Sequence, residues 1–337
     1  MNTTGLQTRL RDLSAQEAFG LALVGAVVLL AVDLVRLVAI GELAFGRLLS
    51  LLWNGFVDSL YIGLAAIGLS MTYSILRFAN FSHGDLITVG AFSGWTVAYL
   101  IGGIGAAGFG SRLLLDADGG ARARDLGMSV VGSPLAILLG LVAAAVLTVL
   151  VALAIDRLVY KKLRRAGGIT LLIASVGVAL ALRYLIAIVY TQDTRGLVAS
   201  APFWEPAWLP VGPINLHELT LVGSALALIV GVHLLLQYTK LGKSMRAMSD
   251  NRDLALVTGI STERVITSTW IIGAGLAGVA GYLIVLDRSQ ITINLGWFLL
   301  LLVFAAVILG GIGSIYGALA GSLVIGTTIN LSLVWLP

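Results

Sequence analysis

The chain has 337 residues, of which 58% are hydrophobic and only 11% are charged, with a formal net charge of +4 and a mean hydropathy of +1.01. A soluble domain carries roughly 25% charged residues, so this composition excludes an ordinary soluble protein. Cysteine is absent, which excludes disulfides, thiolate metal ligands and thiol catalysis. Apolar stretches of about 20 residues recur along the chain, and each can cross a hydrocarbon core of roughly 30 Å as a helix. We therefore expect an all-α integral membrane protein.

Nine apolar stretches are predicted to cross the membrane. They cover 18–40, 51–75, 86–104, 134–156, 169–190, 218–238, 265–286, 295–313 and 315–335. The first follows a polar leader, 1–17, and no small-residue cleavage site comes after it, so we interpret it as an uncleaved span. Asp33 and Arg36 lie three residues apart on one face of this span, where they can pair. The stretches predict a bundle of about 8–10 transmembrane helices in a single transmembrane domain, 1–337.

Two connections between predicted spans, 157–168 and 239–264, are rich in Lys and Arg. Two spans separate them, so they lie on the same side of the membrane, and cationic connections collect on the cytoplasmic side. This predicts a multi-pass protein of the cell membrane with a cytoplasmic N-terminal leader and with 105–133 and 191–217 outside. Because the membrane topology accounts for the excess of Lys and Arg over Asp and Glu, no nucleic-acid partner is predicted.

Few ionisable residues fall inside the predicted spans, and Asp58 and Arg183 lie deepest among them. Charges at such positions usually face a cavity or a partner, because lipid cannot solvate them. Three interpretations remain open: side chains that extend toward the interface, the lining of a translocation pathway, or a mutual ion pair. Together with the nearby Asn54, these residues are candidates for a pathway or gate.

The segment RFANFSHGDL (77–86) breaks the apolar pattern between two predicted spans. Its His83 and Asp85 would suit an acid–base pair. However, no nucleophile and no group of metal ligands accompanies them in the sequence, so neither a catalytic nor a metal site is predicted. The alternatives are a structural hairpin, in which Asn80 and His83 bond to local backbone, and a gate or lining of the pathway.

The connection 239–264 is polar and cationic in an otherwise apolar chain. Its GKS tripeptide, 242–244, resembles the end of a phosphate-binding loop, but Gln237 stands where that motif needs a further glycine. No nucleotide site is therefore predicted, and any ATP chemistry would belong to another chain.

The same connection predicts one short helix that ends at Gly259. Ser249 or Asp250 can cap its start, and Asp253 suits the positive first turn of a helix. Two interpretations are open. The helix is either a linker that lies on the lipid headgroups or a docking helix that presses into a groove of a cytoplasmic partner.

Gly313, Gly317 and Gly321 recur at a spacing of four residues. Small residues at this spacing let helix backbones approach closely in lipid. Internal helix packing and a dimer interface are the two interpretations of this stripe.

Three stretches resemble the permeases of branched-chain amino-acid ABC transporters. They are NGFVDSLYIGLAAIGLSMTYSILRFANFSHGDLITVGAF (54–92), NRDLALVTGISTERVITSTWIIGAGLAGVAGYL (251–283) and VILGGIGSIYGALAGSLVIG (307–326). The resemblance implies that the connection 239–264 docks on an ATPase through an acidic residue, a small residue and a glycine, which match Asp253, Ala255 and Gly259. We also include two basic residues of this connection, Arg246 and Arg252, in the predicted coupling site. Leu254 departs from the pattern, because the family more often has alanine there.

The resemblance implies the transmembrane permease subunit of an importer for branched-chain or related hydrophobic amino acids. The implied partners are a second permease chain, identical or related, two cytoplasmic ATPases, which would bind the ATP, and an external substrate-binding protein. No catalytic activity and no cofactor is expected in this chain itself. One alternative is a permease for urea, short amides or a sugar. An ion-coupled carrier would be expected to use buried acidic residues in the span centres, which are nearly absent, and an intramembrane enzyme would need a convergent catalytic group.

Overall fold

The computed structural model describes residues 15–104, 128–164, 166–192, 194–200, 202–205 and 211–336. For 15–24 and Arg195 it describes the backbone alone. Most of the predicted leader 1–17, most of the connection 105–133 and parts of the connection 191–217 lie outside the described residues. What the sequence predicts for those parts stays a prediction.

One compact unit comprises residues 1–50 together with 207–212. Its described part contains α2 (Ala15–Ala39), which corresponds to the first predicted span, and the beginning of α3 (Phe45–Leu76). Within α2, Nε of Arg36 lies 3.0 Å from Oδ1 of Asp33, so the predicted pairing is confirmed. Ser50 donates its hydroxyl to the carbonyl of Val211 and so joins the two segments of this unit.

The second unit, 51–206 with 213–337, contains the other helices. Its long helices after α3 are α4 (Ser82–Gly102), α5 (Pro134–Ile155), α7 (Gly168–Tyr190), α8 (Leu216–Tyr238), α11 (Thr262–Arg288), α12 (Leu295–Gly310) and α13 (Ile315–Ser332). Among the described residues, seven helices are long and apolar enough to cross a membrane, and α12 is a shorter apolar helix of 16 residues. The prediction of an all-α polytopic membrane protein is confirmed.

The helices α3, α4 and α11 form the core of the second unit. In their most apolar windows 83%, 67% and 83% of the residues are buried, compared with 22–33% in α5, α7, α8 and α13. The outer helices are the richer in Leu, Val and Ile, because side chains that face lipid must be apolar. Small and polar residues therefore collect in the three central helices.

Close backbone contact joins α13 to α12. A side chain at Gly317 would collide with the carbonyl of Gly310, and one at Gly321 would collide with the carbonyl of Ala306. Internal packing is therefore confirmed for these two glycines. Gly313 does not belong to the helical stripe, because it lies before α13 with a positive φ of 89° in the turn after α12.

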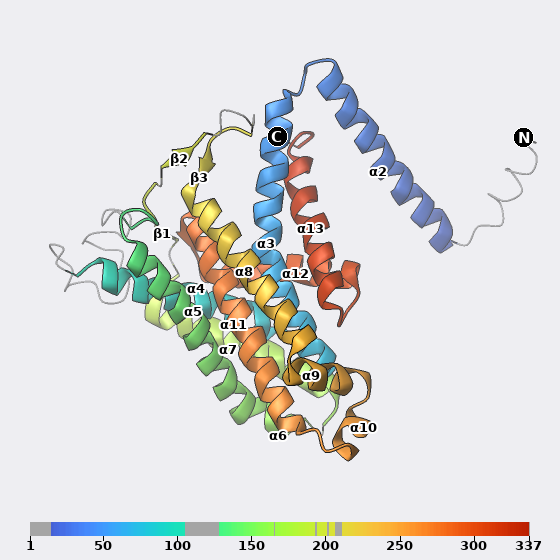
Figure 1. The fold of residues 1–337 in the computed structure, drawn as a ribbon, viewed down its shortest axis with the longest axis vertical. Coiled ribbons are helices and arrows are strands. Elements are labelled where there is room, and N and C mark those ends of the chain that lie inside the picture. The colour runs from blue at the N-terminus through green and yellow to red at the C-terminus, as the bar shows by residue number, and fades with distance from the viewer. Residues whose placement is uncertain are drawn as a thin grey trace, which may run out of the picture. The chain divides into compact units, whose positions relative to one another are not determined.

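Short elements mark the two ends of the bundle (Figure 1). At one end lie α6 (Lys161–Leu163), α9 (Lys240–Asp250) and α10 (Arg252–Val257), and at the other lie β2 (Phe203–Trp204) and β3 (Ile214–Asn215), which pair antiparallel. A second antiparallel pair joins β1 (Arg195–Gly196) to β4 (Gln290–Ile291), directly after α11. The strands β2 and β3 of the connection 191–217 thus belong to the end opposite α10.

The two basic connections meet in an ion-pair network at the α10 end. Glu263, in the first turn of α11, lies 3.2 Å from Nζ of Lys161 and 2.7 Å from Nη1 of Arg164. Arg164 also bonds to Asp156, at 2.7 Å, in the π-helical turn Asp156–Tyr160 between α5 and α6. This contact confirms that 157–168 and 239–264 lie on the same side.

Candidate functional site

The polar connection 239–264 forms two helices, where the sequence predicts one. Thr239 caps α9 by accepting a hydrogen bond from the backbone N–H of Gly242 at 3.0 Å. The cap of α10 is Asn251, whose side-chain oxygen accepts from the N–H of Leu254 at 3.0 Å. The prediction of Ser249 or Asp250 as the cap is wrong, because both residues belong to the last turn of α9. Asp253 does lie in the first turn of α10, as predicted.

Gly259 ends α10 in a Schellman motif. Its φ is +85°, and its N–H donates to the carbonyl of Leu256 at 3.1 Å, while the N–H of Ile260 donates to the carbonyl of Ala255 at 3.0 Å. These two bonds satisfy carbonyls that the helix leaves free. The residue that adopts the left-handed conformation in this motif, here Gly259, is ordinarily glycine. The predicted end of the helix at Gly259 is confirmed.

The outer surface of α10 is apolar and exposed. Leu254 and Leu256 are each 60% exposed and Val257 is 84% exposed. The charged Arg252 and Asp253 are exposed beside them. Large apolar side chains in this position fit either an interaction surface or the membrane interface.

Ala255, which the resemblance implies as a docking residue, is only 2% exposed. It packs against the body of the protein and supports α10 from within. The surface that a partner can reach is therefore provided by the leucines and the valine of α10.

The helix α9 attaches α10 to the bundle. Its Met245 and Met248 are buried, and the guanidinium of Arg77, directly after α3, donates to the carbonyl of Ser249. The predicted coupling residue Arg246 is exposed and donates to the side chain of Gln237 at 3.2 Å. Through α9, the helix α10 is thus connected to the end of α3.

The segment between α3 and α4 is a structural junction. Oδ1 of Asn80 accepts from the N–H of Ser82 at 3.1 Å and from its hydroxyl at 2.7 Å, and the same hydroxyl lies 2.7 Å from that of Tyr160. Asn80 thus bonds locally, as one interpretation expected. His83 instead bonds through Nε2 to the carbonyl of Ala65 in α3, at 2.9 Å.

The acid–base interpretation of His83 and Asp85 is wrong, because each is engaged elsewhere. Asp85 is fully buried in α4 and accepts two hydrogen bonds from Arg183 of α7, each at 3.1 Å. The same guanidinium lies over the ring of Trp297, 4.8 Å from its centroid. One ion pair and one aromatic ring therefore connect α4, α7 and α12. No group of three or more His, Cys, Asp or Glu side chains with metal-site geometry occurs in the described part of the chain.

Asp58 is the centre of a second buried cluster. Its carboxylate accepts from Tyr61 at 2.5 Å and from Asn330 of α13 at 2.8 Å, and Arg288 of α11 lies 3.4 Å away. The interpretation of Asp58 and Arg183 as a mutual pair is wrong, since each has another partner. Asn54 lies on the exposed side of α3.

The sequence pointed to Asp58 and Arg183 but missed most of their partners. Tyr61 is one helical turn after Asp58 and was recognisable as a neighbour. Arg288 and Asn330 come from helices far along the chain, and no local pattern marks them. Only the tertiary fold reveals these clusters.

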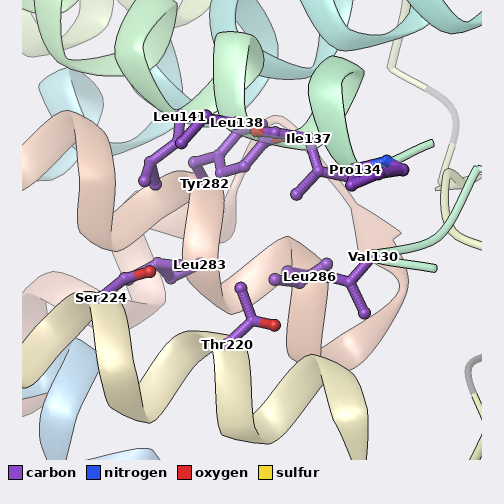
Figure 2. A pocket seen from close by; sticks show the side chains of 10 residues that line it. All are labelled: Val130, Pro134, Ile137, Leu138, Leu141, Thr220, Ser224, Tyr282, Leu283 and Leu286. Carbon is purple, nitrogen blue, oxygen red and sulfur yellow. The ribbon is translucent and has the colours of Figure 1, made fainter.

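A largely apolar cavity of about 240 Å³ lies between α5, α8 and α11 (Figure 2). Leu138, Leu141 and Leu283 line much of it, and the hydroxyl of Tyr282 is engaged at 2.8 Å with the carbonyl of Ile137. The hydroxyl of Thr220 likewise bonds to backbone, the carbonyl of Leu216, at 3.0 Å. This lining carries no charge, so the cavity suits an apolar group and not a zwitterion.

A helical bundle with polar clusters buried among its spans, and a capped amphipathic helix exposed at one end, has the architecture of a membrane transport subunit. The sequence profile of the family described as branched-chain amino acid transport system / permease component matches residues 51–337. The chain belongs to this family.

Named relatives agree with that assignment. The chain is 27% identical to the high-affinity branched-chain amino acid transport system permease protein LivH of Salmonella typhimurium, over 85% of this chain and 86% of the relative. It is 26% identical to the corresponding permease protein BraD of Pseudomonas aeruginosa, over 81% and 82%. A probable LivH of Methanocaldococcus jannaschii is 27% identical, over 83% and 80%. No solved structure matches the chain.

Proposed function

We propose that this chain is the non-catalytic permease subunit of an ABC importer for branched-chain amino acids and that α10 is where a cytoplasmic ATPase holds it. The geometry of α10 carries the proposal. A six-residue helix, closed at both ends by hydrogen bonds, exposes Leu254, Leu256 and Val257 at one end of the bundle. A short helix with an apolar outer face is the kind of element that fits a groove of a partner.

The proposed assembly has two permease chains, identical or related, two ATPases and an external substrate-binding protein. The family membership and the names of the relatives support this assignment. ATP is bound by the ATPases, and this chain needs no cofactor of its own. The N-terminus and the 239–264 connection face the cytoplasm, and the single transmembrane domain 1–337 forms half of the pathway.

Closure of the ATPases moves α10, and two routes lead from there into the bundle. One route runs through α9 to Arg77 at the end of α3. The other runs directly along the chain, because α11 begins only five residues after α10 ends, at Thr262. Both α3 and α11 belong to the buried core, so their displacement changes the position of the polar groups inside.

Reconstitution tests this proposal. In liposomes the chain alone should neither hydrolyse ATP nor accumulate leucine. With its ATPase and binding protein, it should take up leucine when ATP is supplied on the ATPase side. Uptake by the chain alone, driven by a proton or sodium gradient, would establish an ion-coupled carrier instead. ATP-driven uptake of urea or a sugar in place of leucine would keep the class of transporter and change the substrate.

A further inference from the structure

A second cavity lies where α11 ends and α12 begins, beside α3. Its volume is about 310 Å³, within the size range of sites for small molecules. Tyr61, Arg288 and Thr292 contribute polar groups to its lining, while Phe298 and Leu302 contribute apolar ones. The combination of a guanidinium with an aliphatic and aromatic wall distinguishes it from the uncharged cavity beside Tyr282.

Arg288 is held in place on one side and open on the other. Within the described residues, all its hydrogen bonds are made by Nη2, to the hydroxyl of Tyr61 at 2.9 Å and to both oxygens of Asp58 at 3.4 Å. Asp58 is itself fixed by Tyr61 and by Asn330. The side chain of Arg288 is nevertheless 56% exposed, and no hydrogen bond within the described residues occupies its Nε or Nη1 donors. A guanidinium positioned in this way is suited to bind a carboxylate through two hydrogen bonds.

We propose that this cavity is a binding site for an aliphatic α-amino acid during translocation. Arg288 binds the α-carboxylate, and Phe298 and Leu302 contact the branched side chain. A sugar or urea has no carboxylate to accept two hydrogen bonds from Arg288 and no aliphatic side chain to contact the apolar wall. This inference rests on the proposed function and specifies where in the chain the substrate is recognised.

The position of the cavity suits a site at which substrate enters. The 27 residues of α11, at about 1.5 Å each, place Arg288 about 40 Å along the helix from Thr262. The cavity therefore lies at the end opposite α10, which is the external end if α10 binds the ATPase. Gln290, a further lining residue, pairs with Gly196 across β1 and β4, so β1 is attached to the rim of the cavity.

Thiol protection tests the site directly, because the chain contains no cysteine. Thr292→Cys places one thiol in the lining, and Asn294→Cys places one on the exposed surface two residues away. With the full chain in lipid nanodiscs, L-leucine should slow the modification of the Thr292→Cys thiol by a methanethiosulfonate reagent at least fivefold and leave the Asn294→Cys thiol unaffected. Leucinol, which lacks the carboxylate, should not protect. Equal protection by leucinol, or by a fatty acid in place of leucine, would overturn the proposal in favour of a purely apolar or lipid site.

Two further variants in the Thr292→Cys background identify the groups that bind. Arg288→Gln should raise the leucine concentration needed for half protection about 30-fold, since a hydrogen-bonded charge partner is lost. Arg47→Gln, on the exposed surface of α3, is the matched control and should change nothing. Leu302→Phe narrows the apolar part without touching Asp58, and should weaken protection by leucine more than protection by alanine. Unchanged protection by leucine in both Arg288→Gln and Leu302→Phe would refute the site.

Uptake by the complete transporter separates this inference from the proposed function. If the wild-type chain with its ATPase and binding protein transports leucine but leucine does not protect the Thr292→Cys thiol, this site is wrong and the function stands. If no leucine uptake occurs in the complete transporter, the proposed function fails first.

Discussion

Gly259→Val tests the docking role of α10 with a change confined to its end. The left-handed conformation of Gly259, at φ +85°, costs a non-glycine residue about 1–2 kcal/mol, and β-branched side chains tolerate it least. A Cβ at this position would meet no atom within 4 Å, so the cost comes from backbone conformation and not from a clash. The fold of the bundle should therefore be preserved.

The expected effect on docking is larger than that on folding. If the backbone relaxes instead, the strain is relieved but the bonds from Gly259 to Leu256 and from Ile260 to Ala255 are weakened, at a similar cost. A cost of about 1–2 kcal/mol lowers the ratio of intact to frayed α10 roughly 5- to 30-fold. A helix of six residues has few other contacts to offset this loss.

Co-purification of the ATPase with the permease, measured beside ATP-driven leucine uptake, is the assay. Gly259→Val should express normally, lose most of the bound ATPase and lose uptake, whereas Gly259→Asn should retain much of both, because asparagine tolerates the left-handed region. Gly41→Val is the matched control, since Gly41 also has a positive φ, +79°, with open space around it. Wild-type values of both measurements for Gly259→Val would show that α10 is only a linker.

Three further predictions concern the coupling helix, the topology and the buried ion pair. Asp253→Arg reverses the charge in the first turn of α10, which should cost about 0.3–1 kcal/mol and reduce ATPase co-purification. Single cysteines at Lys243 and Phe203, both exposed, should differ in intact cells, with an impermeant thiol reagent labelling only the one at Phe203. Arg183→Ala leaves the carboxylate of Asp85 buried without its cation, so the detergent-solubilised protein should lose about 3–5 kcal/mol of stability and unfold at a lower temperature.

Controls sharpen these three measurements. Glu42→Arg makes the same change of charge at an exposed residue outside α9 and α10 and should retain the ATPase, which separates the dipole of α10 from net charge. Labelling of the thiol at Lys243 from outside would invert the topology and contradict docking at α10. Arg36→Ala breaks an exposed ion pair in α2 and should leave the unfolding temperature unchanged. If the Arg183→Ala variant unfolds like Arg36→Ala, the burial of the Asp85 pair is misjudged.

Much of the fold was predictable because a helix that crosses a bilayer must be about 20 residues long and predominantly apolar. Each predicted span coincides with a helix, and the basic connections on either side of α7 and α8 do meet, as their spacing indicated. The helix end at Gly259 was predictable too, because a glycine that follows a short amphipathic stretch is itself a signal for the end of a helix. Local signals were less decisive at the start of α10, since Ser249, Asp250 and Asn251 are all good caps and only packing selects Asn251.

The buried polar partners were not predictable from local patterns. Asp58 could have paired with several cations, and its contact with Arg288 depends on how α3 and α11 pack. Ala255 shows the same limitation, because a small residue fits a docking surface and a tightly packed interior equally well. Its 2% exposure is decided by contacts with the body of the protein that the segment itself does not encode.

The helix α3 connects the Arg288 cavity with the end of the bundle at which α10 lies. It contains no proline, the usual cause of a sharp kink, and the 19 residues from Asp58 to Leu76 form a rod of about 27 Å. Tyr61 stands near one end of the rod, in the lining of the Arg288 cavity, and Arg77 holds the carbonyl of Ser249 just beyond the other. Two sites on one helix are thermodynamically linked when each ligand binds two positions of that helix with different affinity, and linkage is reciprocal. In the proposed transporter, an amino acid that favours one position of Tyr61 would therefore strengthen or weaken ATPase binding by the same free energy by which the ATPase alters the binding of the amino acid.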